Sequence, residues 1–178
     1  MNTLDDAIKK FEAIEVQRRS ISALLANMSE AQCAKRPNIN KWSINEVIGH
    51  LLMAERLSLQ YVNKKKLGIN TVEKAGIFSL LRLMFLELVL ILPFRYKAPS
   101  NAEPNVEGQT IAELFVKWEQ QRKELRLLLE ELHGHLDKEL FKHPFAGRMS
   151  LMHMMVFYQR HTKHHLLQIS RIKKLIEE

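Results

Sequence analysis

The residues best suited to chemistry in this chain are two histidines near its C-terminal end, His161 and His165. They are four residues apart, in a segment whose apolar residues recur at helical spacing: Met154, Phe157, Ile169, Ile172 and Leu175. Side chains at this spacing leave one face of a helix a single turn apart, so both imidazoles can bind the same metal ion. Gln168 falls on the same face, where it can orient a ligand or satisfy a buried backbone group.

A metal that takes part in chemistry usually has three protein ligands and one open position for water or substrate. The third candidate is His50, which lies far away in the sequence but also in a segment with helical spacing. We therefore expect a metal site formed by His50, His161 and His165. His164 is an alternative to His165, although it points farther round the helix. Each histidine also has a simpler interpretation, since the pair can be solvated and His50 can be a hydrogen-bonded core residue.

Three neutral imidazoles would leave the charge of a divalent ion uncompensated. Such an ion is a strong Lewis acid and lowers the pKa of a bound water or thiol toward neutrality. Nitrogen ligands suit both zinc and nickel, and the sequence does not choose between them. Glu46 lies one turn before His50 and could act as a general base, but its spacing from Ser43 predicts a capping box, which we favour.

Four long helices must position these residues. We expect them at about residues 3–25, from Ser43 to the lysines at 64–66, from Thr110 to Gly134, and from Ser150 to about 176. Ser29 can begin one short additional helix. No stretch alternates between apolar and polar residues as a half-buried strand would. The predicted fold is therefore an all-α four-helix bundle, in which inward-facing ligands come from different helices.

A densely apolar segment at residues 75–94 adds a further helix between the second and third helices of the bundle. It contains Arg82 and Glu87, and its uninterrupted apolar part is shorter than the ~18 residues that a membrane span needs. We expect this helix to be buried in the core or in a dimer interface. The alternatives are a peripheral contact with a membrane surface and an apolar wall of a substrate cavity.

Composition limits the class of protein. A chain of 178 residues with 46% hydrophobic and 26% charged residues fits one soluble helical domain, which we expect to span residues 1–178. A single cysteine, Cys33, and an acidic N-terminus without a secretory signal predict a cytoplasmic protein. The net charge is +7, but the basic residues are scattered and not interleaved with aromatic ones, so we do not expect nucleic-acid binding.

Three motifs resemble, in order, those of the DinB/YfiT-like superfamily of bacterial four-helix metalloproteins: Trp42-Ser43-x-x-Glu46-Val47-x-x-His50-Leu51, His143-Pro144 with Gly147, and His161-x-x-His164-His165-x-x-Gln168-Ile169. The resemblance implies a bundle that binds a divalent metal, often zinc or nickel, through one histidine of the second helix and two of the last. These positions match His50, His161 and His165. The resemblance also implies a homodimer.

Members of this superfamily with known activity use the metal to activate a low-molecular-weight thiol, as S-transferases or thiol-dependent isomerases, and others are described as metal-dependent hydrolases. We therefore expect an enzyme that activates a thiol or water for S-transfer to, or hydrolysis of, a small molecule. The alternative is a non-catalytic module, in which the metal stabilises two helices and residues 75–94 serve dimerisation or contact with a membrane surface. The apolar insertion at 75–94 is a departure from a compact member and leaves the substrate open.

Overall fold

The computed structural model describes residues 3–91, 104 and 106–178. Helices dominate this part of the chain, and the predicted all-α class is confirmed. The elements are α1 (Leu4–Leu25), α2 (Glu30–Ala34), α3 (Ile44–Lys66), η1 (Ile69–Thr71), α4 (Ile77–Ile91), α5 (Ile111–Glu131), η3 (His133–His135), β1 (Phe141–His143), β2 (Gly147–Met149) and α6 (Leu151–Glu177).

Local capping determines where the long helices begin. The side chains of Thr3, Ser43 and Thr110 each accept a hydrogen bond from the backbone N–H three residues later, and a carboxylate at that position bonds back to the cap. Ser150 accepts from the N–H of His153 at the start of α6. Each cap satisfies backbone donors that have no partner within the helix. The predicted starts of all four bundle helices are therefore confirmed.

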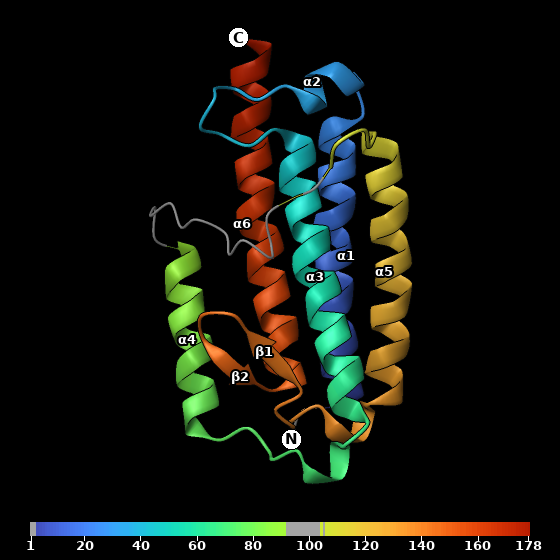
Figure 1. Cartoon of the computed structure of the whole chain (residues 1–178), viewed down its shortest axis with the longest axis vertical. Helices are drawn as coiled ribbons and strands as arrows, with labels where there is room; N and C mark the ends of the chain where they lie inside the picture. The colour runs from blue at the N-terminus through green and yellow to red at the C-terminus, as the bar shows by residue number, and fades with distance from the viewer. Residues whose placement is uncertain (1–2, 92–103, 105) are drawn as a thin grey trace.

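The four long helices α1, α3, α5 and α6 form the bundle (Figure 1). Helix α1 contacts α5 and α6, and α3 contacts the same two helices, so each helix has two neighbours and α3 lies diagonally across from α1. Fully buried apolar side chains from all four fill the centre, among them Ile14, Leu51, Trp118 and Ile169. The helix that carries His50 thus packs directly against the helix that carries the histidine pair.

Helix α4 lies on the outside of the bundle, where it contacts α6 and strand β2 (Figure 1). Its bounds confirm a helix within the predicted segment, and residues 92–94 of that segment lie outside the described residues. These contacts show that α4 packs onto the bundle from outside. None of the helices in the described ranges is long and apolar enough to cross a membrane.

The structure also contains a short antiparallel hairpin, although no stretch of the sequence alternates as a half-buried strand would. Strands β1 and β2 pair with Phe141 opposite Met149 and His143 opposite Gly147. Gly147 has a positive φ of 88°, which favours glycine after the tight turn. Each strand has only three residues, too few to produce an alternating pattern in the sequence. The hairpin buries Phe141 and Met149 in the core beside α6.

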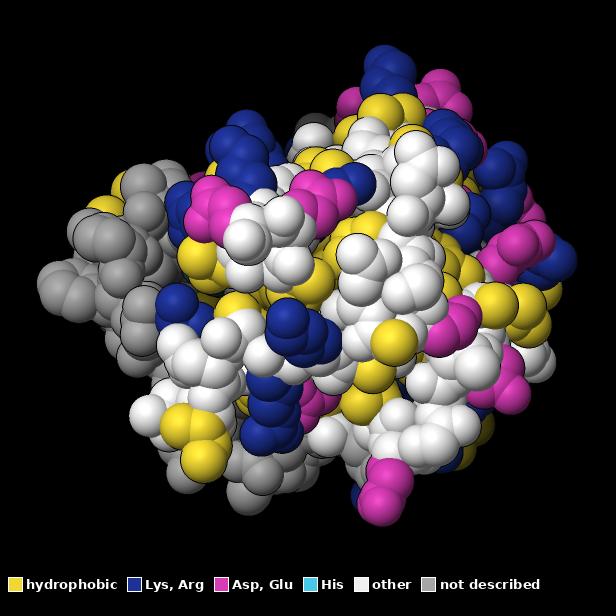
Figure 2. All heavy atoms as spheres, turned by 90° about the horizontal axis from the view of Figure 1, so that it is seen from above, with side chains coloured by type: hydrophobic (Ala, Val, Ile, Leu, Met, Phe, Trp, Pro, Cys, Tyr) yellow, Lys and Arg dark blue, Asp and Glu magenta, His cyan; other side chains and the backbone are white. Residues whose placement is uncertain are grey.

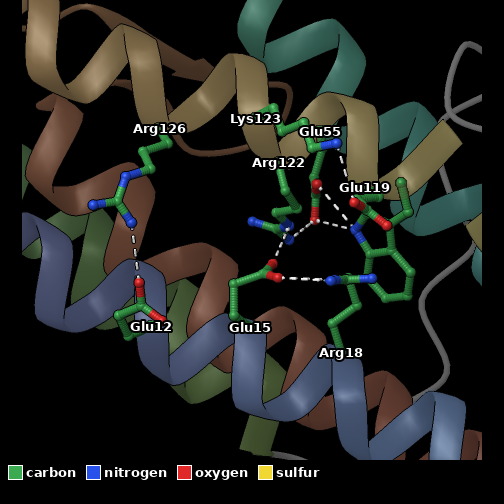
Figure 3. A network of polar contacts seen from close by, with 9 residues as sticks. Glu12, Glu15, Arg18, Glu55, Glu119, Arg122, Lys123 and Arg126 are labelled. Atoms are coloured by element: carbon green, nitrogen blue, oxygen red, sulfur yellow. Dashed lines mark hydrogen bonds and ion pairs between the residues drawn. The ribbon is translucent and has the colours of Figure 1, made fainter. Parts of the chain in front are cut away.

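A buried network of charged residues joins three helices of the bundle (Figure 3). Arg122 of α5 is 2% exposed and forms ion pairs with Glu55 of α3 and, at 3.4 Å, with Glu15 of α1. Glu15 also accepts a hydrogen bond of 2.8 Å from Arg18, and the indole N–H of Trp118 donates to Glu55 at 3.2 Å. Because buried charges need partners, this network ties α1, α3 and α5 to one relative arrangement.

Charges of both signs are mixed on the end of the bundle that carries α2 and the C-terminal end of α6. In Figure 2, Lys and Arg side chains alternate with Asp and Glu across this surface. One reason is local pairing, as between Arg36 and Glu46. The surplus of positive charge therefore does not form a continuous basic field on this end.

Candidate metal centre

The three predicted ligand residues come from the middle of two neighbouring helices. His50 lies two turns into α3, at a position fixed by the cap at Ser43. His161 and His165 lie one turn apart on the side of α6 that faces α3. All three are buried, with exposed fractions of 8%, 8% and 6%. The structure thus brings together residues that are more than a hundred positions apart in the sequence.

Their ring nitrogens converge on one point. The Nε2 atom of His161 lies 3.3 Å from Nε2 of His50 and 3.0 Å from Nε2 of His165. One ligand atom from each residue lies within 4.8 Å of the other two. With Zn–N bonds of about 2.0–2.1 Å, neighbouring ligands are about 3.3 Å apart at tetrahedral angles and about 2.9 Å apart at right angles. The separations of His161 from His50 and from His165 both fit a single ion of this size.

The donor set also fits a cation better than it fits hydrogen bonding. An imidazole nitrogen carries either one hydrogen or one lone pair, whereas Nε2 of His161 is within reach of two other Nε2 atoms. Burial, followed by the neighbouring imidazoles, holds the pKa of His161 well below its usual value, and the same causes lower the pKa of His165 to about 3. Both rings are therefore neutral at neutral pH, with lone pairs available for a metal.

Neighbouring side chains fix the orientation of two of these rings. Nδ1 of His165 lies 2.7 Å from Oε1 of Gln168, and because an amide oxygen can only accept, the ring donates through Nδ1 and keeps its lone pair on Nε2. The ring of Phe157 stacks on His161, with centroids 5.0 Å apart and an interplanar angle of 19°. The sequence pattern placed Gln168 on the same face of the helix as the ligands. Its contact with His165 shows that Gln168 orients a ligand.

His164, the alternative ligand, does not join the cluster. Its Nδ1 atom lies 3.1 Å from the backbone oxygen of Leu90, so it connects α6 to the last turn of α4. Its ring is 5.1 Å from that of His165, measured between centroids, and lies nearly perpendicular to it. Of the two adjacent histidines, His165 is therefore the one that faces His50.

Glu46 has the role of a helix cap. Its carboxylate accepts a hydrogen bond of 2.8 Å from the N–H of Ser43 and forms an ion pair with Arg36. Burial by itself would raise the pKa of Glu46, but the hydrogen bonds from Arg36 and Ser43 outweigh it and lower the pKa. A carboxylate held in this way is a poor proton acceptor, so the capping interpretation is confirmed and the general-base alternative is not supported.

Two aromatic contacts and one histidine near the site were not expected from the sequence. The ring of Trp42 lies 5.1 Å from that of His50, between centroids. His143 of the hairpin lies edge-on to Phe157 at 4.9 Å, and its Nδ1 accepts from the N–H groups of Phe145 and Ala146, both at 3.3 Å. The His143-Pro144 motif drew attention to His143 in the sequence. Spacing along the chain did not indicate that His143 would contact Phe157.

Comparison with known proteins agrees with this fold. The model of the DinB superfamily matches residues 13–169, a range that includes His50, His161 and His165. The chain is also similar to the uncharacterized protein YuaE of Bacillus subtilis (strain 168), with 26% identity over 162 residues that cover 86% of this chain and 90% of that protein. On the extent of the family match, this chain belongs to the DinB superfamily.

Proposed function

We propose that this protein is a metal-dependent enzyme that transfers a thiol to an electrophilic small molecule or hydrolyses one, with His50, His161 and His165 as the ligands of one divalent ion. The observation that carries the proposal is the convergence of three Nε2 atoms, 3.0 and 3.3 Å apart, in a buried position between α3 and α6. When bound, a divalent ion supplies a Lewis acid that lowers the pKa of a coordinated thiol or water.

The residues around the three histidines prepare the site for that chemistry. Imidazole ligands bring no negative charge to an ion, so they would leave its positive charge available to a substrate atom. Gln168 keeps the lone pair of His165 directed at the cluster. Trp42 and Phe157 cover two of the rings with apolar surface, which limits the access of water. Nitrogen donors and a buried position support zinc or nickel as the ion.

Metal content tests the ligand assignment. The wild-type protein and the His161→Ala and His164→Ala variants are dialysed against a weak chelator, and bound metal is measured by elemental analysis. We expect one zinc or nickel ion per chain in the wild type and in His164→Ala, and none in His161→Ala. His164 is the matched control because it is adjacent to a ligand yet bonds to Leu90 instead. Stoichiometric metal in His161→Ala would falsify the assignment.

Turnover separates an enzyme from a structural metal site. The zinc-loaded and nickel-loaded proteins are assayed for transfer of cysteine, glutathione or bacillithiol to chlorodinitrobenzene and for hydrolysis of nitrophenyl acetate. We expect one of these activities in the wild type and in His164→Ala, and its loss in His50→Ala and His161→Ala. Metal binding without any turnover across this panel would favour the second candidate, a module in which the ion only joins α3 to α6.

The second candidate function also has an observation in its favour. The three ligands come from two neighbouring helices and are deeply buried, which is the arrangement of a site that stabilises a bundle. In that case, removing the metal lowers the free energy of unfolding but abolishes no reaction. The activity panel described above distinguishes the two candidates.

A further inference from the structure

The outer side of α4 is apolar from Ile77 to Leu88. Every residue on it is between 43% and 71% exposed: Ile77, Phe78, Leu80, Leu81, Met84, Phe85 and Leu88. At 100° per residue these positions form one continuous arc that contains none of the charged residues of α4. The opposite side, with Ser79, Leu83 and Leu86, is buried against the bundle. Helix α4 therefore has two apolar sides, and the bundle covers one of them.

The size of this outer face matches what a stable protein interface requires. An aromatic side chain removes roughly 150–250 Å² from water when it is buried completely. Seven large apolar side chains that are each more than two-fifths exposed thus present several hundred Å². A standard interface buries ~800 Å² on each partner, of which roughly 55–65% is apolar. The apolar area of this face is therefore comparable with the apolar part of a standard interface.

The spacing along the centre of the face is that of a helix that packs against another helix. Ile77, Leu81, Met84 and Leu88 follow one another at intervals of four, three and four residues. This alternation is the heptad pattern of helices in side-by-side contact, in which each side chain inserts between residues of the facing helix. A partner helix uses this spacing, whereas a lipid surface does not need it.

The charged residues at the two edges of the face also favour a protein partner. Glu87 at one edge forms an ion pair of 2.9 Å with Arg160 of α6. Arg82 at the other edge lies 3.9 Å from Glu139, which also lies 4.0 Å from Arg148. Both edges thus carry acidic and basic groups together, as the polar rim of a protein interface does. A helix that binds anionic lipid has a surplus of Lys and Arg along its edges instead.

We propose that α4 is a dimerisation helix, which packs against α4 of a second copy of this chain across a two-fold axis. A two-fold contact brings the same surface of both copies together, so that surface must be compatible with itself. The outer face of α4 meets this condition because it is apolar from end to end and pairs no charge with a like charge. The proposal concerns a surface separate from the three histidines, so it holds whether or not the metal site is catalytic.

Charge substitutions in the centre of the face test the proposal. Leu81→Glu and Leu88→Glu place a carboxylate in the seam, and Leu127→Glu is the matched control, since Leu127 is a 66% exposed leucine on α5. Sedimentation velocity is measured over a wide range of concentrations. We expect twice the chain mass of 20.9 kDa for the wild type and the control, and a dimer dissociation constant raised at least 100-fold for both seam variants.

Cysteine cross-linking gives a second measurement that does not depend on destabilising the interface. Single cysteines replace Leu81, Met84 or Leu88, and the native Cys33 is buried. Under mild oxidation we expect a covalent dimer from the position nearest the two-fold axis, and none from the control Leu127→Cys. A wild-type protein that is monomeric at all concentrations, or a control that loses the dimer as the seam variants do, would overturn the proposal.

A lipid occupant is tested with the same variants. Co-sedimentation with vesicles of phosphatidylcholine, alone and mixed with phosphatidylserine, should leave the wild-type protein in the supernatant. If instead the wild type is a monomer that pellets with vesicles, and Leu81→Glu prevents this, the face binds lipid and the dimer proposal is wrong.

Discussion

At the scale of single residues, the site depends on contacts that orient the ligands as much as on the ligands themselves. His165 has two ring nitrogens, and only the bond between Nδ1 and Gln168 directs its Nε2 lone pair toward His161 and His50. A metal-binding histidine commonly has such a partner, and loss of the partner weakens metal binding without removing a ligand. Gln168 is therefore a positioning residue.

Replacement of Gln168 by leucine should weaken metal binding about 10- to 100-fold, because His165 loses the acceptor that fixes its ring. Gln168→Glu keeps an acceptor at the same position and should retain most of the affinity. Competition with a chromophoric chelator measures both constants, and circular dichroism checks that the helices are intact. Equal affinities for the wild type and Gln168→Leu would show that the ring is oriented by its other contacts.

His143 should make the stability of the metal-free protein depend on pH. Burial lowers the pKa of His143 from 6.5 to about 4. Between these pH values the unfolded chain binds a proton at this residue and the folded protein does not, so the free energy of unfolding falls as the pH falls. Denaturation in urea at several pH values should show a slope that His143→Gln reduces, by up to about 1.4 kcal/mol per pH unit. An unchanged slope would exclude His143 as a contributor.

The ligand residues could be predicted because helix geometry is local, whereas their surroundings could not. A spacing of four residues on α6 places His161 and His165 on one face whatever the rest of the chain does. The edge-on contact of His143 with Phe157 and the approach of Trp42 to His50 depend on how far each helix is rotated and on where the hairpin lies. Those quantities come from long-range packing, which a single sequence does not display.

At the scale of elements, the ion pairs of Arg122 determine how three helices meet. Arg122 is buried between Glu55 and Glu15, and its removal leaves the carboxylate of Glu55 in the core without its positive partner and Glu15 with Arg18 alone (Figure 3). Burial already raises the pKa of Glu55, against the opposing effects of Arg122 and the Trp118 N–H. Loss of Arg122 alone should therefore destabilise the fold, whereas replacement of both Arg122 and Glu55 by neutral residues should change the free energy of unfolding little.

Arg122→Ala should lower the free energy of unfolding by about 3–5 kcal/mol, since it leaves buried charge unpaired. The matched control is Arg126→Ala, one turn later on α5, whose ion pair with Glu12 is half exposed and should contribute about 1 kcal/mol or less. The double variant Arg122→Met with Glu55→Gln removes both charges and should recover most of the loss. Urea denaturation measures all three. A similar loss in both single variants would mean that burial of the ion pair is not decisive.

The boundaries of the helices could be predicted well because capping is read over four consecutive residues. Ser43 with Glu46, and Thr110 with Glu113, gave the starts of α3 and α5 directly. The hairpin gave no such signal, since its strands are short and its pairing joins residues on both sides of a turn. For α4 the sequence predicted a helix but left open whether its apolar residues would be buried, because its outer and inner sides are equally hydrophobic.

At the scale of the whole molecule, the candidate site is a polar connection through the core between helices that are not neighbours in the sequence. The histidines join α3 to α6, and the network of Arg122 joins α1, α3 and α5. The sequence predicted the bundle from helical periodicity and predicted which two helices carry ligands. It did not contain a pattern for the charged network, whose members stand singly on separate helices.

Because the three ligands belong to α3 and α6, bound metal should stabilise the whole fold. A ligand that binds only the native state adds about 4 kcal/mol to the free energy of unfolding at a thousand times its Kd. Addition of zinc to the chelator-treated wild type should therefore raise the Tm by several degrees. His161→Ala should show no such rise, whereas His164→Ala, with its ligand set intact, should respond as the wild type does.

Differential scanning calorimetry with and without zinc measures this response, and its dependence on metal concentration distinguishes binding from a general salt effect. A specific site saturates at one ion per chain, and its effect is reversed by chelation. If His161→Ala were stabilised by zinc as much as the wild type, the ion would be binding elsewhere on the chain. The three converging nitrogens would then form a core contact between α3 and α6 without a role in metal binding.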